Sequence, residues 1–181
     1  MKNLTAPRGW FRAGSHPKQY DMGLDPSVCC NEMATALVRS CSNTSDGFGT
    51  LMQSCKTGAF ADTRVRFSAM TRTQGVDEWA GLWLRIDGPI QGESLNFDNM
   101  QDRALRGTSG WQRHSVTLDV PKETTKLAFG VLLSGQGSVW IADVHMETVG
   151  LDVPTTNLKL DEPNIPEAPV NLAFTDKPGH H

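Results

Sequence analysis

Apolar and polar residues alternate with a period of two along most of the chain, which is the pattern of half-buried β-strands. Val65–Met70 is one such run, and Ala80–Asp87 is a second that ends in the turn sequence Asp-Gly-Pro. Further runs of this kind are 36–40, 49–53, 112–120, 126–133 and 138–146. Seven or more short strands without a strong amphipathic helix predict an all-β fold, specifically a two-sheet antiparallel jelly-roll sandwich.

The sharpest alternation places Leu82, Leu84 and Ile86 on one face of a strand, with Trp83 and Arg85 on the other. In a sandwich, one face of each sheet packs on the core and the other is exposed or lines a groove. An aromatic ring beside a guanidinium suits a sugar ring or a carboxylate, through stacking and bidentate hydrogen bonds. The alternative is that a loop or the C-terminal segment covers Trp83 while Arg85 pairs with Asp98 or Asp87.

Charge and hydropathy narrow the choice of partners. The chain has 181 residues, with 17 Lys and Arg against 20 Asp and Glu and a net charge of −3, so it lacks the basic footprint expected for direct nucleic-acid binding. No apolar stretch of about 18 residues is present, and the first residues lack the apolar core of a signal peptide. We therefore expect a cytoplasmic protein that does not bind membranes.

Composition along the chain predicts one domain over residues 1–150 and a proline-rich tail or linker over residues 151–181. Five of the ten prolines fall in the second segment, where they disfavour regular structure. The four cysteines all lie in the first third of the chain and lack metal-binding spacing, which predicts free, partly buried thiols.

Several segments together resemble a bacterial domain associated with transcriptional regulators, and the resemblance spans residues 10–156. The segments are Trp10–Ser15, Gly47–Gln53, Trp79–Pro89, Phe97–Arg103 and Phe129–Gly135. Members of that family occur alone or joined to a helix-turn-helix region, and similar jelly rolls form the galactose-binding-like, carbohydrate-module class. The resemblance implies a ligand-sensing domain. This sequence contains no basic helix-turn-helix segment, so regulation would require a partner.

A ligand groove is predicted around Trp83, Arg85, Asp98, Gln101 and Gln53. The polar segment that contains Asp98 and Gln101 follows a strand, and such loops often carry binding groups on a rigid scaffold. The expected ligand is a small molecule or a carbohydrate. The alternative is that Asp98 only neutralises Arg85 and that the polar side chains close the loop through their own backbone.

A second hypothesis is a small enzyme in which the same groove performs acid/base chemistry on an organic substrate, with Asp98 and Arg85 as the catalytic candidates. Glu93 or Asp102 could supply a second carboxylate, although nothing in the sequence sets its separation from Asp98. No nucleophile elbow and no phosphate-binding glycine motif is present. A third hypothesis is a structural accessory domain.

Metal binding and self-association complete the expectations. Asp143 lies in the last strong strand run and could contribute to a structural Ca²⁺ site, which needs six to eight oxygen ligands. We expect no other cofactor. Edge strands in a sandwich also make a homodimer a candidate assembly.

Overall fold

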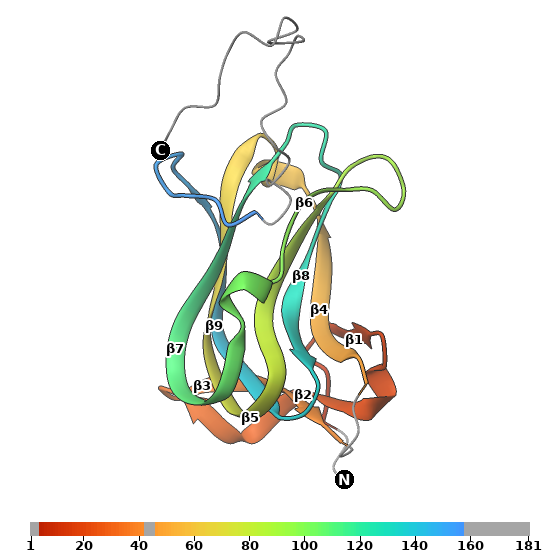
Figure 1. The fold of residues 1–181 in the computed structure, drawn as a ribbon. Coiled ribbons are helices and arrows are strands. Elements are labelled where there is room, and N and C mark those ends of the chain that lie inside the picture. The colour runs from red at the N-terminus through yellow and green to blue at the C-terminus, as the bar shows by residue number, and fades with distance from the viewer. Residues whose placement is uncertain (1–3, 42–45, 158–181) are drawn as a thin grey trace, which may run out of the picture.

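The computed structural model describes residues 4–41 and 46–157. Within these residues the chain forms nine strands and three short 3₁₀ helices, and it contains no α-helix (Figure 1). The strands are β1 (Phe11–Gly14), β2 (Tyr20–Cys30), β3 (Met33–Ser40), β4 (Phe48–Lys56), β5 (Thr63–Asp87), β6 (Ser94–Asp98), β7 (Leu105–Val120), β8 (Lys126–Ser134) and β9 (Ser138–Val149). The 3₁₀ helices are η1 (Pro17–Gln19), η2 (Gly58–Phe60) and η3 (Gln101–Arg103).

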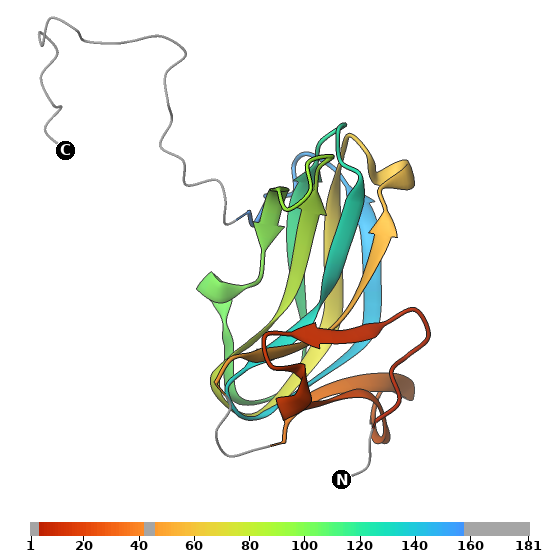
Figure 2. The same ribbon diagram turned by 90° about the vertical axis from the view of Figure 1, so that its right-hand side faces the viewer.

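The long strand β5 belongs to both sheets of the sandwich. Its first half pairs antiparallel with β7 and β9, and β3 and β2 extend this first sheet in the order β7-β5-β9-β3-β2. Its second half pairs with β8 and β6, and β4 and β1 extend the second sheet in the order β6-β5-β8-β4-β1. Figures 1 and 2 show the N-terminal strands at the lower end of the molecule, in red to orange.

β5 changes sheet at a corner between residues 71 and 80. Three register shifts in its pairing with β7 lie there, and extra residues of this kind bend a strand. Gly75 lies in the middle of the corner with φ +58°, a conformation that costs glycine little. The two strands expected around positions 65–70 and 80–87 are therefore halves of one strand.

The core lies between the two sheets. Phe67 of the first sheet packs in it with Leu82, Leu84 and Ile86 of the second, all four fully buried. The rings of Phe67 and Phe129 approach with centroids 5.2 Å apart. The predicted inward face of residues 82–86 is thus confirmed, and so is the all-β jelly-roll sandwich.

The edges of β6 and β7 are joined by the end of the described chain. The backbone N–H of Thr156 donates to the carbonyl of Thr117 in β7 at 2.8 Å. The backbone N–H of Phe97 in β6 donates to Oδ1 of Asn157 at 3.3 Å. Both views show these last described residues beside β6 (Figures 1 and 2). Contacts therefore continue beyond the expected boundary at position 150, and the rest of the predicted tail, 158–181, lies outside the described residues.

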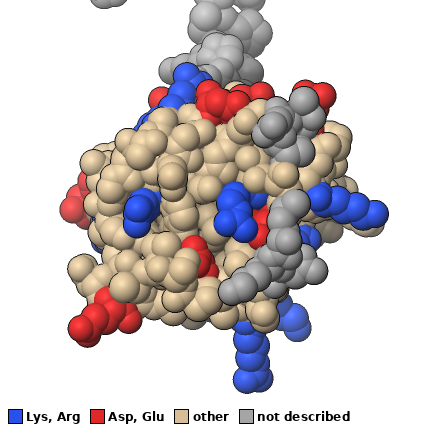
Figure 3. Space-filling view, turned by 90° about the horizontal axis from the view of Figure 1, so that it is seen from below, with Lys and Arg blue, Asp and Glu red and all other residues tan. Residues whose placement is uncertain are grey.

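The composition also predicted that the protein lacks a basic surface and a membrane-spanning segment. At the end of the sandwich that lies lowest in Figure 1, the surface is mostly uncharged with isolated basic and acidic side chains, not a continuous basic patch (Figure 3). No helix in residues 4–41 and 46–157 is long and apolar enough to cross a membrane. The four cysteines form no disulfide, and Cys30 alone among them is fully buried.

Candidate functional site

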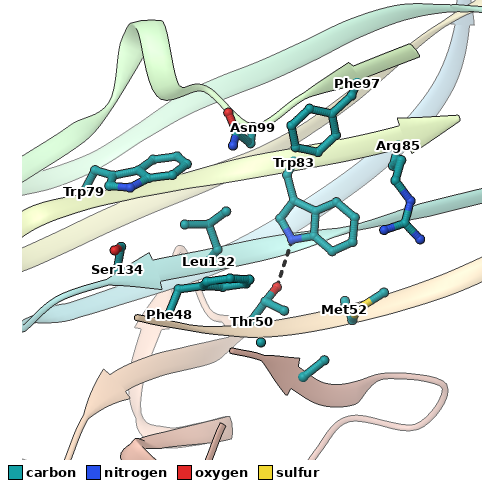
Figure 4. A pocket seen from close by; sticks show the side chains of 12 residues that line it. Phe48, Thr50, Met52, Trp79, Trp83, Arg85, Phe97, Asn99, Leu132 and Ser134 are labelled. Carbon is teal, nitrogen blue, oxygen red and sulfur yellow. Dashed lines mark hydrogen bonds between the residues drawn. The ribbon is translucent and has the colours of Figure 1, made fainter. Parts of the chain in front are cut away.

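A hollow of about 480 Å³ lies on the outer face of the second sheet (Figure 4). Strands β4, β8 and β5 form its floor, and β1 and β6 contribute its two sides. Its described lining residues are Ala13, Gly14, Phe48, Thr50, Met52, Trp79, Trp83, Arg85, Phe97, Asn99, Leu132 and Ser134. This volume and largely apolar lining are typical of small-molecule sites.

The indole of Trp83 forms the floor of the hollow. Its ring crosses β8 from β5 to β4, where Nε1 donates to Oγ1 of Thr50 at 2.8 Å (Figure 4). Oγ1 of Thr50 in turn donates to the carbonyl of Val131 at 2.8 Å. Gly130 pairs directly with Trp83, and its missing Cβ allows the close approach of β4 at Leu51 and Met52. Because Trp83 is only 6% exposed and its N–H is already bonded, it offers a fixed apolar surface.

Three further aromatic side chains surround this floor. Trp79 precedes Trp83 on the same face of β5, Phe48 opens β4, and Phe97 lies on β6 (Figure 4). Phe48 is 38% exposed, although large apolar side chains are usually more buried. Exposed rings around a hollow provide stacking surfaces for a flat or ring-shaped ligand.

A charged group lies at one end of the hollow. Arg85 lies with its guanidinium carbon 5.9 Å from the centre of the Trp83 ring. Its Nε and Nη2 donate to the two carboxylate oxygens of Asp87 at 2.8 and 3.2 Å. Nζ of Lys126 lies 3.4 Å from the same carboxylate. Arg85 also lines a second hollow of about 400 Å³ beside the β5–β6 turn, so the groove continues past it.

Two polar side chains complete the lining. Oδ1 of Asn99 accepts the backbone N–H of Gln101 at 3.2 Å, which fixes the amide orientation. Oγ of Ser134 donates to Oε2 of Glu78 at 2.6 Å. Among the described residues that line the hollow, none is a carboxylate, a histidine or a cysteine.

The structure brings Trp83 and Arg85 together as expected but places Asp98 elsewhere. Asp98 pairs with the core residue Leu84, so its side chain lies on the inner face of β6 and has no exposed surface. Its oxygens accept the backbone N–H of Met100 at 2.8 Å and Nη2 of Arg103 at 2.6 Å. This corrects the expected position of Asp98 in the groove, and of the two aspartates considered as partners of Arg85 the structure pairs Asp87 with it.

Gln101 and Gln53 do not line the hollow either. Gln101 is exposed in η3, beyond the end of β6. Gln53 pairs with Phe129, a core residue, so it lies on the inner side of β4. The residues of β4 that face the groove have even numbers, such as Met52. Gln53, the next residue, therefore faces the opposite side of the strand.

Asp143 lies on the outer face of the first sheet, away from the aromatic hollow. Its carboxylate accepts a hydrogen bond from Nη2 of Arg113 and lies 2.9 Å from Nε2 of His145. Residues 4–41 and 46–157 contain no group of three or more His, Cys, Asp or Glu side chains placed to hold a metal ion. In the structure, the Asp143 carboxylate therefore faces two nitrogen donors, not further oxygen ligands.

Sequence reasoning missed Phe48 and Trp79, and within the segment Phe97–Arg103 that it placed at the groove it singled out Asp98 and Gln101 where the lining residues are Phe97 and Asn99. Two-residue periodicity from Trp83 would have found Trp79, which lies four positions earlier on the same strand. Phe97 and Asn99 needed recognition of β6 and of the register that pairs Phe97 with Arg85. No local signal relates Phe48 to β5, because β8 separates the two strands and follows both in the chain.

The fold defines the architectural class of the protein, a jelly-roll β-sandwich, and solved structures with a similar sandwich include carbohydrate-binding modules. One similar structure is the CBM22-1 xylan-binding domain of Paenibacillus barcinonensis Xyn10C, with a TM-score of 0.57, 10% identity, and 81% of this chain and 90% of that chain covered. The enzymatically active domain of bacteriophage CBA120 tailspike protein 4 gives a TM-score of 0.60 at 10% identity, over 78% of this chain and 20% of that chain. At these identities the similarity shows the fold.

A relative in sequence comes from Bacillus subtilis (strain 168). It bears the name uncharacterized HTH-type transcriptional regulator YbfP and is 38% identical over 171 residues. The match covers 94% of this chain but 57% of the relative, so the chain spans little more than half of its length. No protein-family model matches the chain.

Proposed function

We propose that this domain is a non-catalytic binding module that holds a carbohydrate or similar ring-shaped small molecule in the aromatic groove. The observation that carries the proposal is the set of rings around one hollow, with Trp83 fixed as the floor and Trp79, Phe48 and Phe97 around it. Rings of this kind stack on the apolar faces of a ligand, while Arg85 supplies hydrogen bonds at one end.

Two comparisons support the proposal. Similar sandwiches include a xylan-binding domain and a module pair from Clostridium thermocellum Xyn10B complexed with xylohexaose, which has a TM-score of 0.57, 13% identity, and 82% of this chain and 28% of that chain covered. The name of the Bacillus subtilis relative supports a place for the domain as the sensing part of a transcriptional regulation system. The alternative of acid/base catalysis lacks a carboxylate among the described lining residues.

Titration with a panel of neutral and acidic oligosaccharides, followed by isothermal calorimetry, tests the binding function. We expect at least one saccharide to bind, and Trp79→Ala to weaken that binding by about fivefold or more, because loss of a stacked ring typically costs about 1 kcal/mol or more. Trp111→Ala is the matched control, because Trp111 is a half-buried tryptophan of β7 that does not line the groove. The proposal is refuted if both variants weaken binding equally, or if the protein binds neither the neutral nor the acidic oligosaccharides.

The regulatory part is tested separately. Introducing Trp79→Ala into the chromosomal gene should alter the ligand-dependent change in transcript levels, whereas Trp111→Ala should leave it as in the parent strain. Identical transcript responses in all three strains would argue against a sensing role.

A further inference from the structure

We infer that the ligand of the aromatic groove is an acidic oligosaccharide, and that the carboxylate of a uronate residue binds the free edge of Arg85. This inference rests on the proposed binding function and specifies its ligand. It depends on three features of the groove: its charge, its balance of hydrogen-bond donors and acceptors, and its length.

The charge of the groove is positive at one point. Arg85 is the one charged residue among the described residues that line the aromatic hollow. Asp87 neutralises it in part, but Lys126 contacts the same carboxylate, so the three side chains together carry one net positive charge. Glu93, exposed in the neighbouring turn, lines the second hollow and is not among the described residues that line the aromatic hollow. An anionic group that approaches Arg85 from the aromatic hollow would therefore meet the guanidinium and no lining carboxylate.

The guanidinium keeps a free hydrogen-bonding edge. Asp87 occupies the edge formed by Nε and Nη2, and Nη1 of Arg85 donates to no described residue. A guanidinium has five N–H donors, so the edge formed by Nη1 and Nη2 can bind a second carboxylate in a bidentate manner. Stacking against Trp83 and pairing with Asp87 hold the side chain in place although it is 39% exposed. The fork is thus preorganised for an incoming carboxylate.

The other polar groups of the lining do not favour a neutral sugar. A sugar hydroxyl both donates and accepts hydrogen bonds, so a site for a neutral saccharide offers acceptors as well as donors. Here Oδ1 of Asn99 is bonded to backbone, and Thr50 is bonded to both Trp83 and Val131. The amide Nδ2 of Asn99 and Nη1 of Arg85 are two remaining donors, and the hydroxyl of Ser134, which already donates to Glu78, leaves one acceptor oxygen. A ligand rich in acceptors fits this set.

The length of the groove favours a chain of rings over a single one. Trp79 and Arg85 lie six residues apart on β5, which corresponds to about 20 Å at the usual rise of a strand. Phe97 of β6 pairs with Arg85 of β5, so a ligand ring beside Phe97 and Trp83 would place its substituent at the guanidinium. The next rings would extend toward Trp79. A uronate at the Arg85 end of an oligosaccharide therefore satisfies both the rings and the charge.

The test uses matched pairs of acidic and neutral ligands with the full chain. The probes are tetragalacturonate, tetramannuronate and a glucuronate-substituted xylooligosaccharide, each compared with its methyl ester, and benzoate represents a carboxylate on an isolated ring. We expect at least one acid to bind tenfold or more tightly than its ester in calorimetry, and more tightly than benzoate. The preference should shrink at high salt, because screening weakens an exposed charge pair.

Variants then assign the preference to Arg85. Arg85→Gln should remove the acid-over-ester preference, and Arg85→Lys should retain part of it. Arg66→Gln is the control, because Arg66 lies on β5 with the same 39% exposure and pairs with Glu147 on the opposite face of the sandwich. Thermal melting confirms that each variant is folded.

The outcomes separate this inference from the proposed function. If esters bind as tightly as acids and binding still depends on Trp79, the binding function stands and the acidic ligand is refuted. An acid-over-ester preference that persists in Arg85→Gln refutes the role of Arg85. If benzoate binds more tightly than the acidic oligosaccharides, the inferred oligosaccharide ligand is refuted in favour of an aromatic acid. If no saccharide binds, both proposals fail.

Discussion

Replacing Arg103 with methionine is expected to destabilise the domain, because the carboxylate of Asp98 would remain buried without its cation. Asp98 has no exposed surface and lies 2.6 Å from Nη2 of Arg103. Removing one partner of a buried ion pair typically costs about 3–5 kcal/mol. Because Arg103 is itself one-third exposed, and the backbone N–H of Met100 still bonds to Asp98, we expect the lower end, about 3 kcal/mol.

Urea denaturation followed by tryptophan fluorescence measures this loss. With a slope of about 2–3 kcal/mol/M, the midpoint of Arg103→Met should fall by about 1–1.5 M. Asp102→Asn is the control: Asp102 contacts the same arginine through Nη1 but is 55% exposed, so its loss should cost less than about 1 kcal/mol. The free energy of unfolding falls linearly with urea concentration, so a small shift of the midpoint means a small loss of stability. If the midpoint of Arg103→Met lies within about 0.3 M of the parent, the structural role of the pair is refuted.

Three further predictions concern the floor of the groove and the opposite sheet. Thr50→Val should lower the free energy of unfolding by about 1–3 kcal/mol, because the buried indole N–H of Trp83 loses its acceptor, and urea denaturation would measure the loss. Gly130→Ala should destabilise the domain by about 1–3 kcal/mol in urea, because an added Cβ would lie 2.3 Å from the backbone oxygen of Leu51; an unchanged midpoint would contradict that packing. His114 has a pKa below its ordinary value of 6.5, chiefly because burial disfavours the charged imidazolium. The unfolded chain therefore binds a proton near pH 6.5 that the folded chain binds only at lower pH. The free energy of unfolding should fall as the pH decreases below about 6.5. Thermal melts between about pH 7.5 and 5 should show a weaker pH dependence for His114→Gln than for the parent.

The alternation of side chains was sufficient to predict most of the fold. Seven strand runs and the inward face of residues 82–86 follow from local periodicity, because burial on one face imposes the two-residue repeat. β2 escaped prediction because it contains Gly23 and Pro26 and shifts register after Leu24. Proline is tolerated there since β2 is an edge strand of its sheet.

The site was less predictable because it depends on pairings between distant segments. Trp83 and Arg85 could be placed on the outer face from their own strand. The side of Asp98 required the register between β5 and β6, and a difference of one residue exchanges Asp98 with Phe97. Phe48 reaches the hollow only because β8, which follows β5 in the chain, inserts between β4 and β5.

The continuity of β5 has a consequence for engineering the groove. Since one strand forms part of both sheets, the register of Val65–Ala69 in the first sheet sets the phase of Trp83 and Arg85 in the second. Deleting one residue at the corner near Gly75 would turn the indole and the guanidinium toward the core and Leu84 toward solvent. Loop grafts that alter ligand preference should therefore be made in the β5–β6 turn, where length can vary without shifting the phase of the whole strand.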